Sequence, residues 1–179
     1  EVLPETAKPV KLKMHALIQG ETITPDSRVL LVDDGSKDGT WDLIQRFHGE
    51  DPLFGGLKLS HNQGHQNALL AGLLYAKDHC DAAISMDADL QDDIEAIDAF
   101  LQAYEKGADV VYGVRSKRET DTFFKRTTAL GFYRVMGLLG VEMVPNHADY
   151  RLMSQRALEG LAQYREVNLF LRGVVPLIG

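Results

Sequence analysis

The stretch VLLVDDGS (29–36) joins four apolar residues to two adjacent acids, a glycine and a serine. An apolar run of this length, bounded by turn residues, is typical of a buried strand that ends at the acids. The chain then continues into a segment that predicts a helix from Gly39 to about Phe47. This order of strand, polar turn and helix is the unit from which α/β folds are built.

The same unit recurs outward along the chain. Further strands are predicted at 57–60, 82–86 and 109–112, and further helices at 64–78 and 93–104. This alternation predicts an α/β fold with a mostly parallel, Rossmann-like sheet and helices on both faces. The pattern after residue 126 is less regular, and we treat residues 1–179 as one domain because no second boundary is visible.

The composition is that of an ordinary globular domain. The chain has 179 residues, 45% of them hydrophobic, and its 19 basic and 26 acidic residues give a net charge of −7. Cys80 is the single cysteine, which excludes disulfide scaffolds and zinc ribbons. No apolar run approaches the roughly 18–20 residues of a membrane span, and the acidic balance argues against a nucleic-acid partner.

The charges are unevenly distributed. Residues 81–98 contain seven acids and no lysine or arginine, whereas residues 115–126 contain five basic residues against two acids. A charge run is usually a solvated helix face. Here the two opposite runs follow successive predicted strands, and ligands of open α/β sheets bind outside the carboxyl ends of the strands. The pattern therefore predicts a site for a phosphate-bearing ligand together with a metal ion.

Asp87 and Asp89 follow the predicted strand 82–86 in the string MDADLQDD (86–93). Alternate residues that leave a strand project to the same side, so both carboxylates can reach one hard cation. Mg²⁺ or Mn²⁺, completed by water and diphosphate oxygens, is the cation that such a pair favours. The alternative is that these acids only cap the following helix and face solvent. An EF-hand is excluded because Asp92 stands at its glycine position.

Asp33 and Asp34 end the first predicted strand, ahead of a turn that contains Gly35 and Gly39. Carboxylates at this position can accept hydrogen bonds from ribose hydroxyls or a base N–H, so a nucleoside site is one interpretation and a plain surface turn is the other. No G-x-G-x-x-G or P-loop motif follows a predicted strand, which disfavours dehydrogenases and Walker NTPases.

His61 and His65 have the i, i+4 spacing of a helical zinc pair. The glutamate of a zincin helix is missing, so we interpret this segment as a turn and helix start shaped by Asn62 and Gly64. Near the end of the chain, Asp149 lies in the string HADYRLMS (147–154), which by itself indicates only a solvated loop.

Five motifs taken together resemble one family. They are VDDGSKDGT (32–40), NQGHQNALLAGL (62–73), MDADLQDD (86–93), ADVVYGVR (108–115) and HADYRLMS (147–154). The set resembles the inverting family-2 glycosyltransferases, and within them the polyprenyl-phosphate glycosyltransferases, the group of dolichyl-phosphate mannosyltransferase and bactoprenol glucosyltransferase. The motifs follow the family's order and cover nearly the whole chain.

The resemblance implies a GT-A fold that takes a nucleotide-diphosphate sugar as its donor. Asp33 and Asp34 match the nucleoside-binding acids of the family. Asp87 and Asp89 match its DxD motif, which holds Mg²⁺ or Mn²⁺ and the donor diphosphate. Gln91 matches the polar residue just after that motif.

On the acceptor side, the resemblance implies cations near an acceptor phosphate. They are Arg115, Lys117, Arg118 and Arg126. Asp149 and Arg151 match the acid and the arginine of the family's acceptor-side motif. By this match, Asp149, Asp89 and Arg115 are the expected catalytic residues, and the others bind substrate.

The two ends of the sequence depart from the family pattern. Family members begin with a strand that ends in a Pro-x-Tyr-Asn-Glu-like string, whereas residues 1–6 resemble the sequence just after it. Membrane-bound members continue into an amphipathic helix and membrane spans, whereas this chain stops at Gly179. We therefore expect a single catalytic domain that lacks its first strand and any C-terminal membrane region.

The expected function is transfer of a sugar, with inversion and with UDP as the favoured carrier, to a polyprenyl or dolichyl phosphate in cell-envelope glycan synthesis. A phosphate monoester is already mostly dianionic at neutral pH, so Asp149 would position groups rather than remove a proton. The expected location is the cytoplasmic face of a membrane, contacted through the missing C-terminal region.

Two alternatives remain open: a family-2 transferase that acts on a sugar hydroxyl, and a non-catalytic module that binds sugar nucleotides. A phospho-receiver domain is disfavoured, because Gly113-Val114-Arg115 stands where a receiver needs a Ser or Thr. The sequence does not distinguish the sugar, and it leaves the oligomeric state open.

Overall fold

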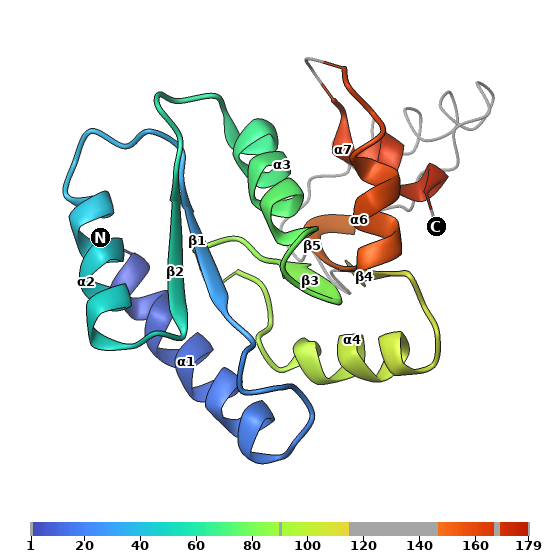
Figure 1. Cartoon of the computed structure of the whole chain (residues 1–179), viewed down its shortest axis with the longest axis horizontal. Helices are drawn as coiled ribbons and strands as arrows, with labels where there is room; N and C mark the ends of the chain where they lie inside the picture. Colours follow the sequence, from blue (N-terminus) through green and yellow to red (C-terminus); the bar gives the residue numbers. More distant parts are fainter. Residues whose placement is uncertain (1, 90, 115–146, 167–168, 179) are drawn as a thin grey trace, which may run out of the picture.

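The computed structural model describes residues 2–89, 91–114, 147–166 and 169–178. Its elements follow in the order α1 (Leu3–Gln19), β1 (Val29–Asp33), α2 (Thr40–Glu50), β2 (Phe54–Lys58), α3 (His65–Ala76), β3 (Ala82–Ser85), α4 (Ala96–Glu105), β4 (Val110–Val114), β5 (His147–Ser154), α6 (Gln155–Leu161), α7 (Leu171–Val174) and the 3₁₀ helix η1 (Val175–Leu177) (Figure 1).

Strands β1 and β2 form a parallel pair with a helix on each side. Leu31 pairs with Gly56, and a Cβ atom at Gly56 would lie 2.6 Å from Ile44 of α2. Val32 points to the opposite face, where it packs so closely on α3 that a Cβ atom at Gly72 would lie 2.9 Å from it. Figure 1 shows α2 and α3 on opposite sides of the pair. Glycines at the two contacts therefore let both helices approach the strands.

The other three strands form an antiparallel sheet in the order β3-β5-β4. Ser85 of β3 and Tyr112 of β4 both pair with Arg151 of β5. Strands β3 and β4 thus run parallel to each other, but β5 lies between them. The sequence did not predict β5, because the charged residues Asp149 and Arg151 made the segment resemble a solvated loop. That interpretation was wrong, since Asp149 is 3% and Arg151 0% exposed.

Alternate residues of β5 build a core on each face of this sheet. Leu152 packs with Leu17 of α1 and Phe100 of α4. Met153 faces the other way and packs with Leu73 of α3 and Leu161 of α6. The predicted arrangement of helices on both faces is confirmed.

Several predicted bounds shift for identifiable reasons. The strand predicted at 57–60 is β2, which begins earlier because Gly55 and Gly56 belong to it. Helix α4 begins at Ala96 rather than at 93, since the carbonyl of Asp93 accepts from the Ala96 N–H and from the Tyr150 hydroxyl. Helix α1 was not predicted, and Pro9 lies inside it.

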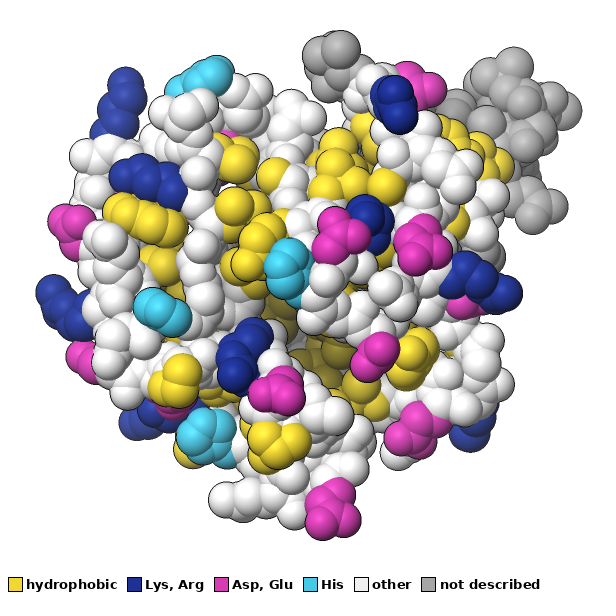
Figure 2. All heavy atoms as spheres, in the orientation of Figure 1, with side chains coloured by type: hydrophobic (Ala, Val, Ile, Leu, Met, Phe, Trp, Pro, Cys, Tyr) yellow, Lys and Arg dark blue, Asp and Glu magenta, His cyan; other side chains and the backbone are white. Residues whose placement is uncertain are grey.

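The surface of the described residues is mixed in charge. Figure 2 shows acidic and basic side chains interspersed over the face that it draws, with hydrophobic side chains visible in a central hollow. Among the described helices, none combines the length and the apolar character that crossing a membrane requires.

Candidate active site

An open pocket of about 770 Å³ lies where the start of α1, the start of α3, the loop after β3, strand β5 and the α7 segment meet. Its lining comprises three acids, three other polar side chains and three apolar residues: Asp87, Asp89, Asp149, His65, Gln66, Arg172, Val2, Ala88 and Phe170. The pocket has the size of a small-molecule site, and six of its nine lining residues carry polar or charged side chains. Three of the acids predicted from the sequence therefore line the same pocket.

The pairing of β3 with β5 brings two of these acids together. Ser85 lies opposite Arg151, so Asp87, two residues beyond Ser85, and Asp149, two residues before Arg151, come to the same end and the same side. The Ser85 hydroxyl donates to the backbone carbonyl of Asp149 and fixes this junction. An acid that follows one strand thus lies beside an acid of another strand that comes 62 residues later along the chain.

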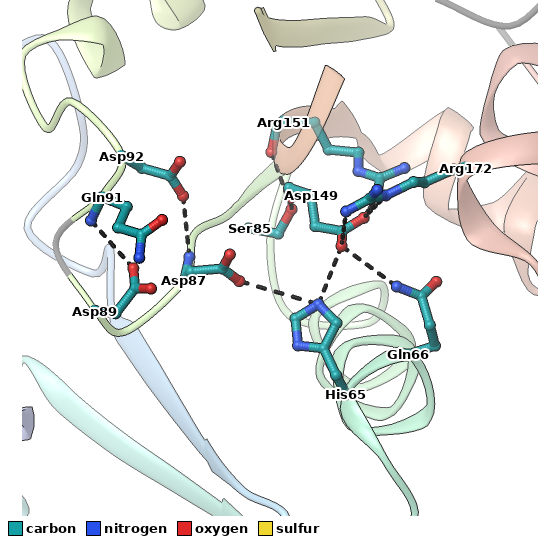
Figure 3. Close-up of polar contacts among 10 residues, drawn as sticks. All are labelled: His65, Gln66, Ser85, Asp87, Asp89, Gln91, Asp92, Asp149, Arg151 and Arg172. Carbon is teal, nitrogen blue, oxygen red and sulfur yellow. Dashed lines mark hydrogen bonds and ion pairs between the residues drawn. The ribbon is translucent and has the colours of Figure 1, made fainter. Parts of the chain in front are cut away.

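Asp149 is a buried carboxylate that accepts hydrogen bonds from four side chains. Its Oδ1 accepts from Arg151 Nη2 at 2.6 Å and from Arg172 Nε at 3.3 Å. Its Oδ2 accepts from Arg172 Nη2 at 3.0 Å, from Gln66 Nε2 at 3.3 Å and from His65 Nε2 at 3.0 Å (Figure 3). These donors occupy the lone pairs of the carboxylate.

The surroundings of Asp149 keep it ionised. Burial alone would raise its pKa, but the hydrogen bonds from Arg172 and His65 and the charges of Arg172 and Arg151 lower the pKa from 3.8 to about 2. A carboxylate with so low a pKa is a poor proton acceptor at neutral pH. Asp149 is therefore suited to hold cationic side chains in place, not to deprotonate a hydroxyl.

Asp87 lies in the opposite kind of environment. Burial raises its pKa, and the nearby carboxylates of Asp92, Asp149 and Asp89 raise it further, while His65, with Nε2 4.0 Å from Oδ1, partly offsets them. Carboxylates grouped without enough nearby positive charge repel one another, and a divalent cation bound among them relieves that repulsion.

Asp87 and Asp89 are the residues predicted to hold a metal ion. Both line the pocket, although in Figure 3 the Asp87 carboxylate turns toward His65 while that of Asp89 lies beside Gln91, whose N–H it accepts. Among the described residues there is no cluster of three or more His, Cys, Asp or Glu that could hold a metal. Two carboxylates plus diphosphate and water oxygens would satisfy Mg²⁺ or Mn²⁺ without such a cluster.

Asp33 and Asp34 lie outside the pocket lining and differ from each other. Asp34 accepts the N–H groups of Gln63 at 2.7 Å and Gly64 at 2.9 Å, which holds the start of α3 beside the end of β1. Asp33 is buried and accepts the Ser36 N–H through Oδ1, while its Oδ2 has no hydrogen-bond partner among the described residues. Nucleoside binding by the two acids stays a prediction, because Asp33 Oδ2 is buried and Asp34 is engaged by the start of α3.

The remaining predicted residues either lie outside the described part of the chain or do not line the pocket. Arg115, Lys117, Arg118 and Arg126 lie outside the described residues. Gln91 is exposed and is not part of the lining. Arg151 is fully buried, so in this structure it reaches the pocket only through Asp149.

Three residues of the site were missed by the sequence analysis: His65, Gln66 and Arg172. The sequence drew attention to His65 only as a zinc partner of His61, which instead contacts Ser60. The signal for His65 and Gln66 was their place in the first turn of a helix that follows a strand end. No local signal distinguishes Arg172, which reaches Asp149 because α7 packs beside β5.

Comparison with known proteins identifies the class to which this fold and site belong. The model of glycosyl transferase family 2 matches residues 13–161, which is most of the chain. The chain belongs to glycosyl transferase family 2. The GT-A type of α/β fold expected from the motifs is thereby confirmed.

Individual relatives show which members of the family the chain resembles. The chain is 55% identical over its full length to the uncharacterized glycosyltransferase YkoT of Bacillus subtilis (strain 168), of which it covers 53%. It is 38% identical over 152 residues to the bactoprenol glucosyl transferase of Shigella phage SfV, and equally to the prophage bactoprenol glucosyl transferase homolog of Escherichia coli (strain K12). Each of these two alignments covers 84% of this chain and 49% of the relative. The chain thus spans about half the length of these relatives, and the resemblance to polyprenyl-phosphate glycosyltransferases is confirmed.

Proposed function

We propose that this chain carries the catalytic site of an inverting glycosyltransferase that moves a sugar from a nucleotide-diphosphate donor to a polyprenyl-phosphate acceptor. The observation that carries the proposal is that the Asp149 carboxylate already accepts hydrogen bonds from four side chains and has a pKa of about 2. Two relatives whose names state a bactoprenol glucosyl transfer support the choice of acceptor. Cell-envelope glycan synthesis is the process that such a product serves.

The chemistry of the acceptor follows from the state of Asp149. A hydroxyl nucleophile must lose a proton to a base, and Asp149 is a poor base because four side chains already donate to it. A phosphate monoester, with a second pKa of about 6, needs no base at neutral pH. The pocket therefore suits an acceptor that arrives ionised.

The transfer is a single displacement that balances without a proton. An oxygen of the acceptor phosphate bonds to the anomeric carbon while the bond from that carbon to the donor diphosphate breaks on the opposite face. The configuration inverts, and the nucleoside diphosphate leaves with the electron pair. A divalent cation, when bound, neutralises charge on the diphosphate.

The described side chains have distinct tasks in this scheme. Asp87 and Asp89 would hold the cation and orient the diphosphate against it. Arg172, whose side chain is 44% exposed at the pocket, offers its guanidinium to a phosphate while Asp149 fixes its position. Asp33 and Asp34 are the acids proposed for the nucleoside, and uridine is the favoured base.

The basic segment 115–126 and the membrane complete the proposal. Its net charge of +3 suits the acceptor phosphate and anionic headgroups at the cytoplasmic face of a membrane, where each Lys or Arg near the surface contributes about 1 kcal/mol.

The test compares two acceptors that share the lipid chain and differ in whether it ends in a phosphate or a hydroxyl. The full-length protein is incubated with Mn²⁺ and a panel of UDP- and GDP-sugars, with either a polyprenyl phosphate or the corresponding polyprenol. We expect lipid-linked sugar only from the phosphate. Transfer to the polyprenol or to a free sugar hydroxyl would contradict the proposed acceptor, and donor binding without transfer to either would indicate a non-catalytic module.

A further inference from the structure

The turn that carries the two acids of the pocket has few anchors of its own. Asp87 donates its N–H to Asp92 Oδ2 at 3.2 Å, and Asp89 Oδ1 accepts the Gln91 N–H at 3.1 Å, so both bonds lie within the loop after β3. Bonds inside a loop fix its shape but not its place relative to the rest of the site.

One residue from a distant element anchors this turn. Thr6 of α1 donates from Oγ1 to the carbonyl of Ala88 at 2.5 Å, across 82 positions of sequence. Of the described residues outside the loop, Thr6 alone donates a hydrogen bond to the backbone of Asp87-Ala88-Asp89. Thr6 is 5% exposed, and its hydroxyl is also 3.2 Å from the carbonyl of Val2 in its own helix.

The helix that carries Thr6 is itself firmly placed. Ala7 packs in a buried cluster with Phe54 of β2, and Leu17 packs in another with Phe100 of α4. Lys13, about two turns beyond Thr6 along α1, donates to Glu95 Oε2 and Asp98 Oδ2, both at 2.7 Å. Helix α1 therefore holds the acidic segment at two points, with Thr6 at the pocket and Lys13 at the start of α4.

We infer that Thr6 is a positioning residue, which fixes the Asp87-Ala88-Asp89 turn in the place that the donor diphosphate and its cation require. The orientation of the Ala88 carbonyl sets the peptide plane that leads into Asp89, and hence where the Asp89 carboxylate lies relative to Asp87. Packing alone would be served equally by valine, which has the shape of threonine without its hydrogen bond. The inference rests on the proposed function for its consequence, although not for the anchor itself.

The first experiment measures transfer kinetics of the full-length protein with Thr6→Val and Thr6→Ser. The Val variant should raise the apparent donor KM and the half-saturating Mn²⁺ concentration by about 3- to 10-fold, which corresponds to one hydrogen bond, and leave the acceptor KM unchanged. The Ser variant keeps the hydroxyl and should stay close to the parent protein. Thr6→Ala is the second variant if Thr6→Val does not fold.

Lys13→Gln is the matched control, because it breaks the other hold of α1 on the acidic segment without touching the turn. It should lower thermal stability and leave the donor KM and Mn²⁺ dependence as they are. If Lys13→Gln and Thr6→Val change these constants alike, Thr6 acts only through the docking of α1, and the inference is overturned.

The second experiment needs neither metal nor substrate. Hydrogen exchange of the metal-free protein should show faster exchange at the amides of Ala88, Asp89 and Gln91 in Thr6→Val than in the parent or in Lys13→Gln. Unchanged exchange overturns the anchor. Faster exchange with unchanged donor and Mn²⁺ constants overturns its role in donor binding. If the parent protein transfers no sugar, the proposed function fails, while the exchange measurement still decides whether Thr6 holds the turn.

Discussion

Asp87 and Asp149 line the same pocket from the ends of two paired strands, yet their surroundings shift their pKa values in opposite directions. Asp149 is buried among two arginines, a histidine and a glutamine, and its pKa falls to about 2. Asp87 is half-buried among other carboxylates, and its pKa rises. The same type of side chain is thus a structural anion in one place and a proposed metal ligand in the other, because its neighbours and not its residue type set its charge balance.

Asp149→Asn should show the largest effect on folding. The neutral amide would leave Arg151, which is 0% exposed, without its anionic partner, and breaking such a buried pair costs about 3–5 kcal/mol. Urea unfolding measures the loss. Asp87→Asn is the matched control and should keep or slightly raise stability, because it removes repulsion. Equal destabilisation by the two substitutions would contradict the different roles assigned to the two acids.

Asp87→Asn should show the largest effect on donor binding. Loss of one ligand to the cation should reduce kcat/KM by about 100- to 1,000-fold, the range for removing one preorganised electrostatic contact. Calorimetry with the nucleoside diphosphate, with and without Mn²⁺, checks whether the loss is metal-dependent; Asp89→Asn should behave alike. Affinity that does not depend on metal in the parent protein would remove both acids from the metal site.

The pH dependence of stability should reveal Asp149 directly. Its folded pKa of about 2 lies below the ordinary 3.8, so its contribution is complete above about pH 5 and is lost progressively as the pH falls through about 2. The expected loss is about 2 kcal/mol. Unfolding free energies measured between pH 5 and 2 should show this component in the parent protein and not in Asp149→Asn. The same curve in both proteins would place the titration elsewhere.

Arg172→Gln should have a smaller effect, confined to a phosphate-bearing substrate. Removing a charge-assisted bond should raise one substrate's KM by about 10-fold, since such bonds contribute about 1.5–3 kcal/mol. Arg156→Gln is the control, because Arg156 pairs with Asp109 away from the pocket. A change in acceptor KM assigns Arg172 to the acceptor phosphate, and a change in donor KM assigns it to the diphosphate. No change in either would leave it as a support of Asp149 alone.

Asp87 and Asp149 also differ in how clearly the sequence pointed to them. Asp87 and Asp89 form a motif directly after a buried strand, and both facts are local. Asp149 was found only through a family motif, because a strand that contains charged residues resembles a loop in sequence. His65, Gln66 and Arg172 were missed, since what makes them part of the site is the register of β5 against β3 and the packing of α3 and α7.

The sequence by itself determined the α/β fold, the acids at the ends of β1 and β3, and the family, because hydrophobic periodicity, strand-end polarity and motif order are properties of neighbouring residues. Only the tertiary structure decided which acids share a pocket and what each can do there. Burial and hydrogen-bond partners come from segments up to 84 residues apart, and they turn Asp149 into an anchored anion while Asp34 is committed to the start of α3. A carboxylate's role depends on the donors around it, and those donors are assembled only when the strands pair.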